Sequence, residues 1–170
     1  AAGIDVTTTG DFSDGLAAYS ANGVATVLNY GHVETSGVNS YGIYASGGDG
    51  AVVYNAATTV VTSGYDADGI AAFSADGYVF VDSGVVNTSG DFSDGILADS
   101  DGSDSGDYVT VLSGTVNTSG DFAEGIDASA DGGDVYITSN SIFTSGYSSG
   151  GIEAFSDDGY IFIGSNDVVT

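Results

Sequence analysis

Carboxylates make up most of the chemistry that this chain could perform. Its 170 residues include 24 acidic residues, no Lys or Arg and a single His, and the formal net charge is −24. The densest acidic stretch, DSDGSDSGD, carries Asp99, Asp101, Asp104 and Asp107. It begins like a calcium-binding loop, but Asp104 stands where that loop needs a sharp-turn Gly, and no Glu ends it. A solvated acidic loop and a Ca²⁺ site are therefore both open for this stretch.

Enzymatic chemistry has little support in these residues. With so many acids, a pair at glycosidase spacing arises by chance. The lone His32 follows Gly31 in an expected turn and has no second His, Lys or Arg to work with. The sequence contains neither a G-x-S-x-G elbow nor a pair of metal-binding His residues. We expect no enzymatic activity.

The charge also restricts the partners. A surface with no basic residue repels nucleic acid and anionic lipid, and it attracts divalent cations. No apolar run approaches the roughly 18 residues of a membrane-spanning helix, so we expect no membrane insertion. The absence of Cys excludes disulfides and thiolate metal sites.

The positions of the acids follow a repeat. VNTSGDFSDGI at residues 86–96 returns as VNTSGDFAEGI at residues 116–126. Weaker copies share the Gly that closes the Thr-Ser-Gly element, at Gly10, Gly37, Gly64, Gly90, Gly120 and Gly146. Subtracting successive positions gives intervals of 27, 27, 26, 30 and 26 residues. A fixed period of this length is typical of a solenoid, in which each repeat stacks on the next.

Each repeat predicts three short strands. The first reads V-x-T, with its Thr on the inward face at Thr8, Thr35, Thr62, Thr88, Thr118 and Thr144. The second holds an inward pair two residues apart, at Leu16/Ala18, Ile43/Ala45, Ile70/Ala72, Ile96/Ala98, Ile126/Ala128 and Ile152/Ala154. The third follows an Asn-Gly or Asp-Gly turn and has inward pairs at Ala25/Val27, Val52/Tyr54, Val79/Val81, Val109/Val111, Val135/Ile137 and Ile161/Ile163. The sequence therefore predicts an all-β solenoid of about six coils, each of 26–30 residues, as a single domain spanning residues 1–170.

Stacking gives a second reason to consider calcium. Asp91 and Asp121 hold the same place in neighbouring coils, and so do Asp94 and Glu124. Carboxylates about 5 Å apart repel each other unless a cation lies between them. We therefore add these four acids to the candidate Ca²⁺ ligands.

Aromatic residues mark the outward face of the third strand. Alternation turns six rings away from the core, at Tyr78, Phe80, Tyr108, Tyr136, Tyr160 and Phe162. Such a stripe predicts a partner surface, and ring stacking between coils is the competing interpretation. Phe12, Phe92 and Phe122 follow the marker Gly, and we expect them to plug a corner of the coil.

The consensus G-x-V-x-T-S-G-x-x-S-x-G-I-x-A-x-S-x-D-G-x-V-x-V resembles the repeats of bacterial autotransporter passengers and related large surface adhesins. The resemblance covers nearly the whole chain and implies a right-handed parallel β-helix displayed outside the cell. The complete lack of Lys and Arg departs from those proteins. The calcium-loaded nonapeptide solenoids are a poorer comparison, because their G-G-x-G-x-D-x-U-x unit does not occur here.

The chain starts within a coil and finishes NDVVT, without a sequence that would cap either edge. This predicts a slice of a longer array, or copies that stack head to tail into a filament. We therefore expect an extracellular structural protein, as a subunit or segment of a fibre or surface filament. An adhesin stalk that binds a glycan or a host surface is the alternative. An ice-binding solenoid is a weaker one, because the Thr ladder shares the register of the inward Val residues.

Overall fold

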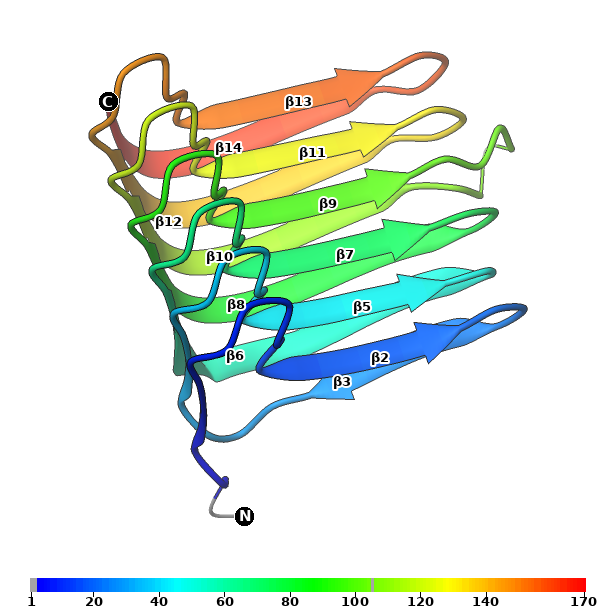
Figure 1. Cartoon of the computed structure of the whole chain (residues 1–170). Coiled ribbons are helices and arrows are strands. Elements are labelled where there is room, and N and C mark those ends of the chain that lie inside the picture. Colours follow the sequence, from blue (N-terminus) through cyan, green and yellow to red (C-terminus); the bar gives the residue numbers. More distant parts are fainter. Residues whose placement is uncertain (1–2, 105) are drawn as a thin grey trace.

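The protein is a parallel β-solenoid of about six turns (Figure 1). The computed structural model describes residues 3–104 and 106–170, and every regular element in these ranges is a β-strand. Successive coils lie directly on one another, and two parallel sheets run the length of the stack. No helix in the described ranges is long and apolar enough to cross a membrane.

One sheet contains the Ile-x-Ala strands that the sequence predicts. Its order is β13-β11-β9-β7-β5-β2, and each pair is parallel and in register. The six strands have five residues each: β2 (Leu16–Ser20), β5 (Ile43–Gly47), β7 (Ile70–Ser74), β9 (Ile96–Ser100), β11 (Ile126–Ala130) and β13 (Ile152–Ser156).

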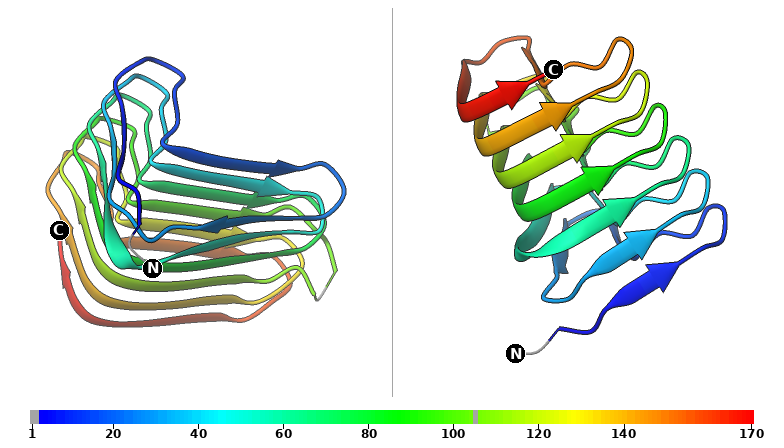
Figure 2. Two further views of the ribbon diagram at one scale, coloured as in Figure 1. Left: turned by 90° about the horizontal axis from the view of Figure 1, so that it is seen from below. Right: turned by 90° about the vertical axis from the view of Figure 1, so that its left-hand side faces the viewer.

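The other sheet corrects the expected count of three short strands per coil. From β6 onward, the third strand of one coil runs through a bend into the V-x-T strand of the next, so most coils have one short and one long strand (Figure 2). The bend lets one ribbon form two sides of the coil without losing its hydrogen-bond ladder. This sheet consists of β1 (Val6–Thr8), β3 (Val24–Leu28), β4 (Val33–Thr35), β6 (Gly50–Thr62), β8 (Tyr78–Thr88), β10 (Val109–Thr118), β12 (Val135–Thr144) and β14 (Ile161–Val169).

The core is a set of vertical columns of like residues. Ile43, Ile70, Ile96 and Ile126 stack on one another, and all four side chains are fully buried. Columns of Val and Ala lie beside them in one continuous cluster. Because identical apolar side chains meet at every step, each coil gives its neighbour a matching surface.

One coil departs from the predicted strand faces. Its inward pair is Ala51/Val53 rather than Val52/Tyr54, since Ala51 pairs with Ala25 and Val53 with Val27, whereas Tyr54 is 45% exposed. Gly50 occupies the place that Tyr78 holds in the next coil. The turn before this strand is therefore shorter than the Asp-Gly spacing suggests, and the side chains of residues 51–55 take the opposite face. An irregularity between Asn55 and Thr59 restores the predicted faces, so Val60 and Thr62 are buried.

The predicted inward Thr column is confirmed. Thr35 is 1% exposed, and its Oγ1 donates to the Ser40 carbonyl at 2.9 Å. Thr8 makes the same bond to the Ser13 carbonyl at 2.7 Å. These hydroxyls therefore fasten the end of the V-x-T strand to the loop that follows it.

Close stacking explains the marker Gly. A Cβ at Gly64 would overlap the carbonyl of Gly37, and one at Gly90 would overlap the carbonyl of Gly64. The same overlap recurs at Gly120 and Gly146. Glycine is required at this place because the loops stack backbone on backbone.

Substitution of Ala98 tests the narrow core. Ala98 is fully buried between Ala72 and Ala128, and Ala98→Leu adds three carbons to a filled column. We expect a loss of about 1–3 kcal/mol or more in unfolding free energy, measured by urea denaturation. Ala17→Leu is the matched control, because Ala17 is exposed on the outer face of the same sheet and should change stability by less than about 0.5 kcal/mol. Ala71 also faces outward, but it is fully buried between the larger Tyr44 and Leu97 and is unsuitable as a control. Equal losses at Ala98 and Ala17 would contradict the assigned faces.

Candidate functional site

Four of the six outward rings surround one hollow of about 330 Å³ near the C-terminal coils. Its polar and aromatic lining residues are Tyr108, Thr110, Asp134, Tyr136, Tyr160 and Phe162. The other two predicted rings lie one coil further from the C-terminus. Tyr78 stacks on Tyr108 with ring centroids 5.5 Å apart. The ring centroids of Phe80 and Tyr54 are 5.4 Å apart.

The hollow exists because the aromatic stripe is interrupted. One outward column reads Tyr78, Tyr108, Asp134, Tyr160, and its neighbour reads Phe80, Thr110, Tyr136, Phe162. Small or short side chains at Asp134 and Thr110 leave space between larger rings. Asp134 is held in place, since its Oδ1 accepts the backbone N–H of Tyr160 at 2.8 Å.

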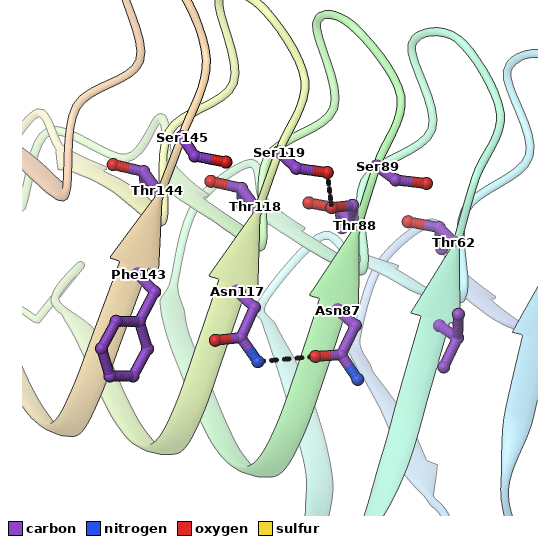
Figure 3. A pocket seen from close by; sticks show the side chains of 11 residues that line it. Thr62, Asn87, Thr88, Ser89, Asn117, Thr118, Ser119, Phe143, Thr144 and Ser145 are labelled. Carbon is purple, nitrogen blue, oxygen red and sulfur yellow. Dashed lines mark hydrogen bonds between the residues drawn. The ribbon is translucent and has the colours of Figure 1, made fainter. Parts of the chain in front are cut away.

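A second concave surface crosses the V-x-T strands of four coils (Figure 3). This groove has a volume of about 390 Å³. One side carries Asn87, Asn117 and Phe143, and the other carries Ser89, Ser119 and Ser145. Val61 pairs with Asn87 in the same column. Asn117 Nδ2 donates to Asn87 Oδ1 at 2.7 Å, so these two amides are linked across neighbouring coils.

The chemistry of this groove is neutral. The residues that line it include no acid, although the chain has 24. Hydroxyl groups recur from coil to coil, and Asn87 and Asn117 add amides in two of the four coils, next to the Phe143 ring. Hydrogen bonds and ring contacts are therefore available to an uncharged ligand. Sequence reasoning missed the groove, although the Asn-Thr-Ser runs in the two near-identical repeats were its signal.

A ladder of rings follows the loop corner after the marker Gly. Tyr65 contacts Phe92, Phe92 stacks on Phe122 with centroids 5.1 Å apart, and Phe122 contacts Tyr147. All four are exposed. This corrects the expectation that Phe92 and Phe122 plug a corner, and Phe12, at 78% exposure, contradicts it as well.

Backbone geometry explains why these phenylalanines point outward. Phe12, Phe92 and Phe122 have φ of 54–56°, and Asn39, Asp66 and Ser148 hold the same left-handed place in the other coils. This conformation costs an L-residue other than Gly about 1–2 kcal/mol, and here it directs the side chain out of the loop. The stack of rings recovers about 0.5–1.5 kcal/mol per pair.

The acidic stretch makes its own hydrogen bonds. Asp99 Oδ1 accepts the Ser129 hydroxyl at 2.6 Å, and Asp107 Oδ2 accepts the Asp104 backbone N–H at 2.6 Å. Asp107 is buried, whereas Asp101 and Asp104 are exposed. Burial raises the pKa of Asp99, and the Ser129 hydroxyl opposes that effect.

The stacked carboxylates are bonded to backbone amides of the next coil. Asp91 Oδ1 accepts the N–H of Asp121 at 2.9 Å, and Asp94 Oδ1 accepts the N–H of Glu124 at 2.7 Å. Among residues 3–104 and 106–170, no three His, Asp or Glu side chains form a group that could hold a metal ion. Calcium stays a prediction for these acids.

Three acids in or next to the Ile-x-Ala strands have raised pKa values. Asp68 is 5% exposed, and burial raises its pKa from 3.8 to about 7, against the opposing effect of the Asp94 backbone N–H. Burial and the nearby Asp68 raise the pKa of Asp94 as well. Burial also raises the pKa of Asp127 to about 6, and Glu153 adds to this. Asp68 therefore retains its proton up to about neutral pH, and the chain has no Lys or Arg that would pair with these acids and lower their pKa values.

Comparison of the chain with protein-family models, curated proteins and solved structures gives no match. The solenoid fold is therefore the part of the autotransporter and adhesin resemblance that the structure supports.

The buried Asp68 predicts that acid stabilises the protein. The folded chain holds this proton more tightly than the unfolded chain, so the stabilisation is complete below pH about 4 and is lost as pH rises toward 7. The unfolding free energy should change by at most about 1.4 kcal/mol per pH unit through this one group. We expect the Tm to fall between pH 5 and 8, and Asp68→Asn to raise the Tm at pH 8 and flatten the profile. Asn retains the oxygen that accepts the Asp94 N–H.

Asp76→Asn provides the control, because Asp76 is an exposed turn residue. It removes the same formal charge without changing a buried site. Identical pH profiles for the Asp68 and Asp76 variants would show that general charge repulsion, and not the buried proton, sets the dependence.

Proposed function

We propose that this protein is an extracellular structural solenoid, a subunit or segment of a fibre or surface filament, with no enzymatic role. The observation that carries the proposal is the match between the residue columns of the two end coils. Inner coils bind one another through these columns, so the end coils present the same surfaces to a second copy, joined head to tail.

Apolar residues of the last coil are available for a joint, whereas Ala25 and Val27 of the first coil are already buried. Ile161 and Ile163 belong to inward columns, yet they are about half exposed because they lie on the last coil. In a second copy placed one coil further along, Ala25 and Val27 would lie over these two residues, and Leu16 would lie over Ile152. Burial of such side chains stabilises a joint as it stabilises the core.

The outer faces of the end coils also match. Phe155 would meet Tyr19, which occupies the same outward column and is likewise exposed. The acids Glu153, Asp157 and Asp158 of the last coil would lie over Ala17, Ala21 and Asn22 of the first. These pairings avoid direct carboxylate contacts, which matters for a chain of charge −24.

In a joint between two copies, the V-x-T segments of the two chain ends would occupy the same position in the stack. Val6 and Val168 belong to a single column, which has one strand more than the Ile-x-Ala sheet. The two V-x-T segments therefore compete at a joint and do not complete each other as halves of a coil. β1 is the easier one to displace, because it has three residues and stands apart from a longer strand, whereas Val168 continues β14.

Truncation tests the joint. Deleting residues 1–8, or residues 166–170, leaves one V-x-T segment per joint, and we expect either variant to form longer filaments than the full chain. Deleting both leaves a gap, so the double truncation should assemble less than either single one. Sedimentation and negative-stain electron microscopy at about 0.15 M salt, which screens charges beyond about 8 Å, measure these lengths. If the full chain and both single truncations stay monomeric at high concentration, the filament proposal fails.

The uncharged groove favours a second candidate, an adhesin stalk that binds a neutral glycan or host surface. Its Asn, Ser and Phe143 side chains suit a hydroxyl-rich ligand better than the acidic remainder of the surface. Binding on a glycan array that Asn117→Asp abolishes would favour this function over the filament. We do not propose ice binding, since Thr35, Thr62, Thr88, Thr118 and Thr144 are buried.

A further inference from the structure

We propose that the hollow around Asp134 binds a small organic cation, an alkylammonium group no larger than trimethylammonium. Tyr108 and Tyr160 lie one coil to either side of Asp134 in the same outward column. A carboxylate between two aromatic residues provides both the countercharge and the ring faces that such cations prefer. We call this space the Asp134 slot.

The spacing of the coils suits a cation of this size. Neighbouring strands are about 4.8 Å apart, so the places of Tyr108 and Tyr160 are separated by roughly 9.6 Å. Rings in this column can lie across the stack, as Tyr78 and Tyr108 do with an interplanar angle of 18°. A cation midway would lie about 5 Å from each ring, inside the roughly 6 Å limit for a cation–π contact.

The neighbouring column closes one side of the slot. Tyr136 and Phe162 stack with centroids 4.6 Å apart and an interplanar angle of 10°, and Thr110 lies one coil below Tyr136. These residues line the same hollow of about 330 Å³. The rings provide apolar contact for methyl groups, and the Thr110 hydroxyl provides one polar contact.

The charges favour an organic cation over other ligands. Asp134 Oδ1 is fixed by the Tyr160 N–H, so the carboxylate does not need to reorganise on binding. The chain has no Lys or Arg that could compete for the slot from within. Asp134 is the sole carboxylate among the residues that line the hollow, which is too few for Ca²⁺, since calcium takes six to eight oxygen ligands. Anions are repelled by the charge of −24.

Choline and its uncharged isostere 3,3-dimethylbutan-1-ol test the proposal. Titration of the full chain, followed by NMR of the Tyr ring protons and by calorimetry, should show saturable binding of choline and at least tenfold weaker binding of the isostere. Potassium chloride, added at the ionic strength of the choline chloride used in the titration, should not displace choline. Two results would overturn the proposal: binding of the isostere as tight as that of choline, or displacement of choline by potassium.

Variants locate the binding. Tyr160→Leu and Asp134→Asn should each weaken choline binding roughly tenfold. Tyr160→Phe should retain it, because the ring remains, and this variant keeps the test valid if the Leu variant is unstable. Tyr30→Leu is the control, since Tyr30 is exposed near the other end of the stack. Unchanged affinity in both slot variants would show that the general negative field, and not the slot, attracts the cation.

A lipid headgroup carries the same chemistry as free choline. Co-sedimentation with phosphatidylcholine vesicles, compared with phosphatidylglycerol vesicles, distinguishes the two sources. Binding of free choline without the vesicles assigns the slot to a soluble cation, and binding of both assigns it to the headgroup.

Discussion

The backbone hydrogen bonds between successive coils are the constraint on which the rest of this structure depends. They hold equivalent residues in register, so each side chain lies directly above and below its counterparts in the neighbouring coils. In the core these counterparts are of the same or a similar type. Columns of Ile, Val and Ala then form the core without any need for a compact globule. The marker Gly and the inward Thr follow from the same ladder, because the loops must stack as closely as the strands.

The ladder also explains how the chain tolerates 24 acids without Lys or Arg. Asp11, Asp91, Asp121 and Asp134 each accept a backbone N–H from the next coil, which partly offsets the stacking of like charges. Asp68 is buried instead, and burial raises its pKa, so a bound proton rather than a counter-ion neutralises the carboxylate. Exceptions to the columns then define the surfaces: Asp134 among tyrosines gives the slot, and Asn and Ser in place of acids give the neutral groove.

Most of the architecture could be predicted from the sequence because a fixed period constrains every copy together. The Ile-x-Ala strands, the inward Thr column and the parallel stack all follow from residues repeated six times. The fused long strands could not be predicted, because nothing in the Ser83-Gly84 or Ser113-Gly114 dipeptides separates a bend within a strand from a break between strands. The face of the strand at Ala51 was predicted wrongly, because the turn before it differs in length from the other turns. Phe92 and Phe122 were assigned to a corner by their apolar character, whereas left-handed backbone geometry turns them outward.

The most direct test of the account is the register itself. Asn87 and Asn117 are 30 residues apart in the chain, but their side chains are hydrogen bonded in adjacent coils, and Phe143 lies one coil further along the same column. The chain has no Cys of its own, so a cysteine pair reacts without competition. A chain with Asn87→Cys and Asn117→Cys should form a disulfide within the monomer on mild oxidation, because the two sites are about 4.8 Å apart, within disulfide range. A chain with Asn87→Cys and Phe143→Cys, whose sites are about 10 Å apart, should form none within the monomer. Equal disulfide formation within the monomer in the two chains would contradict the in-register stack.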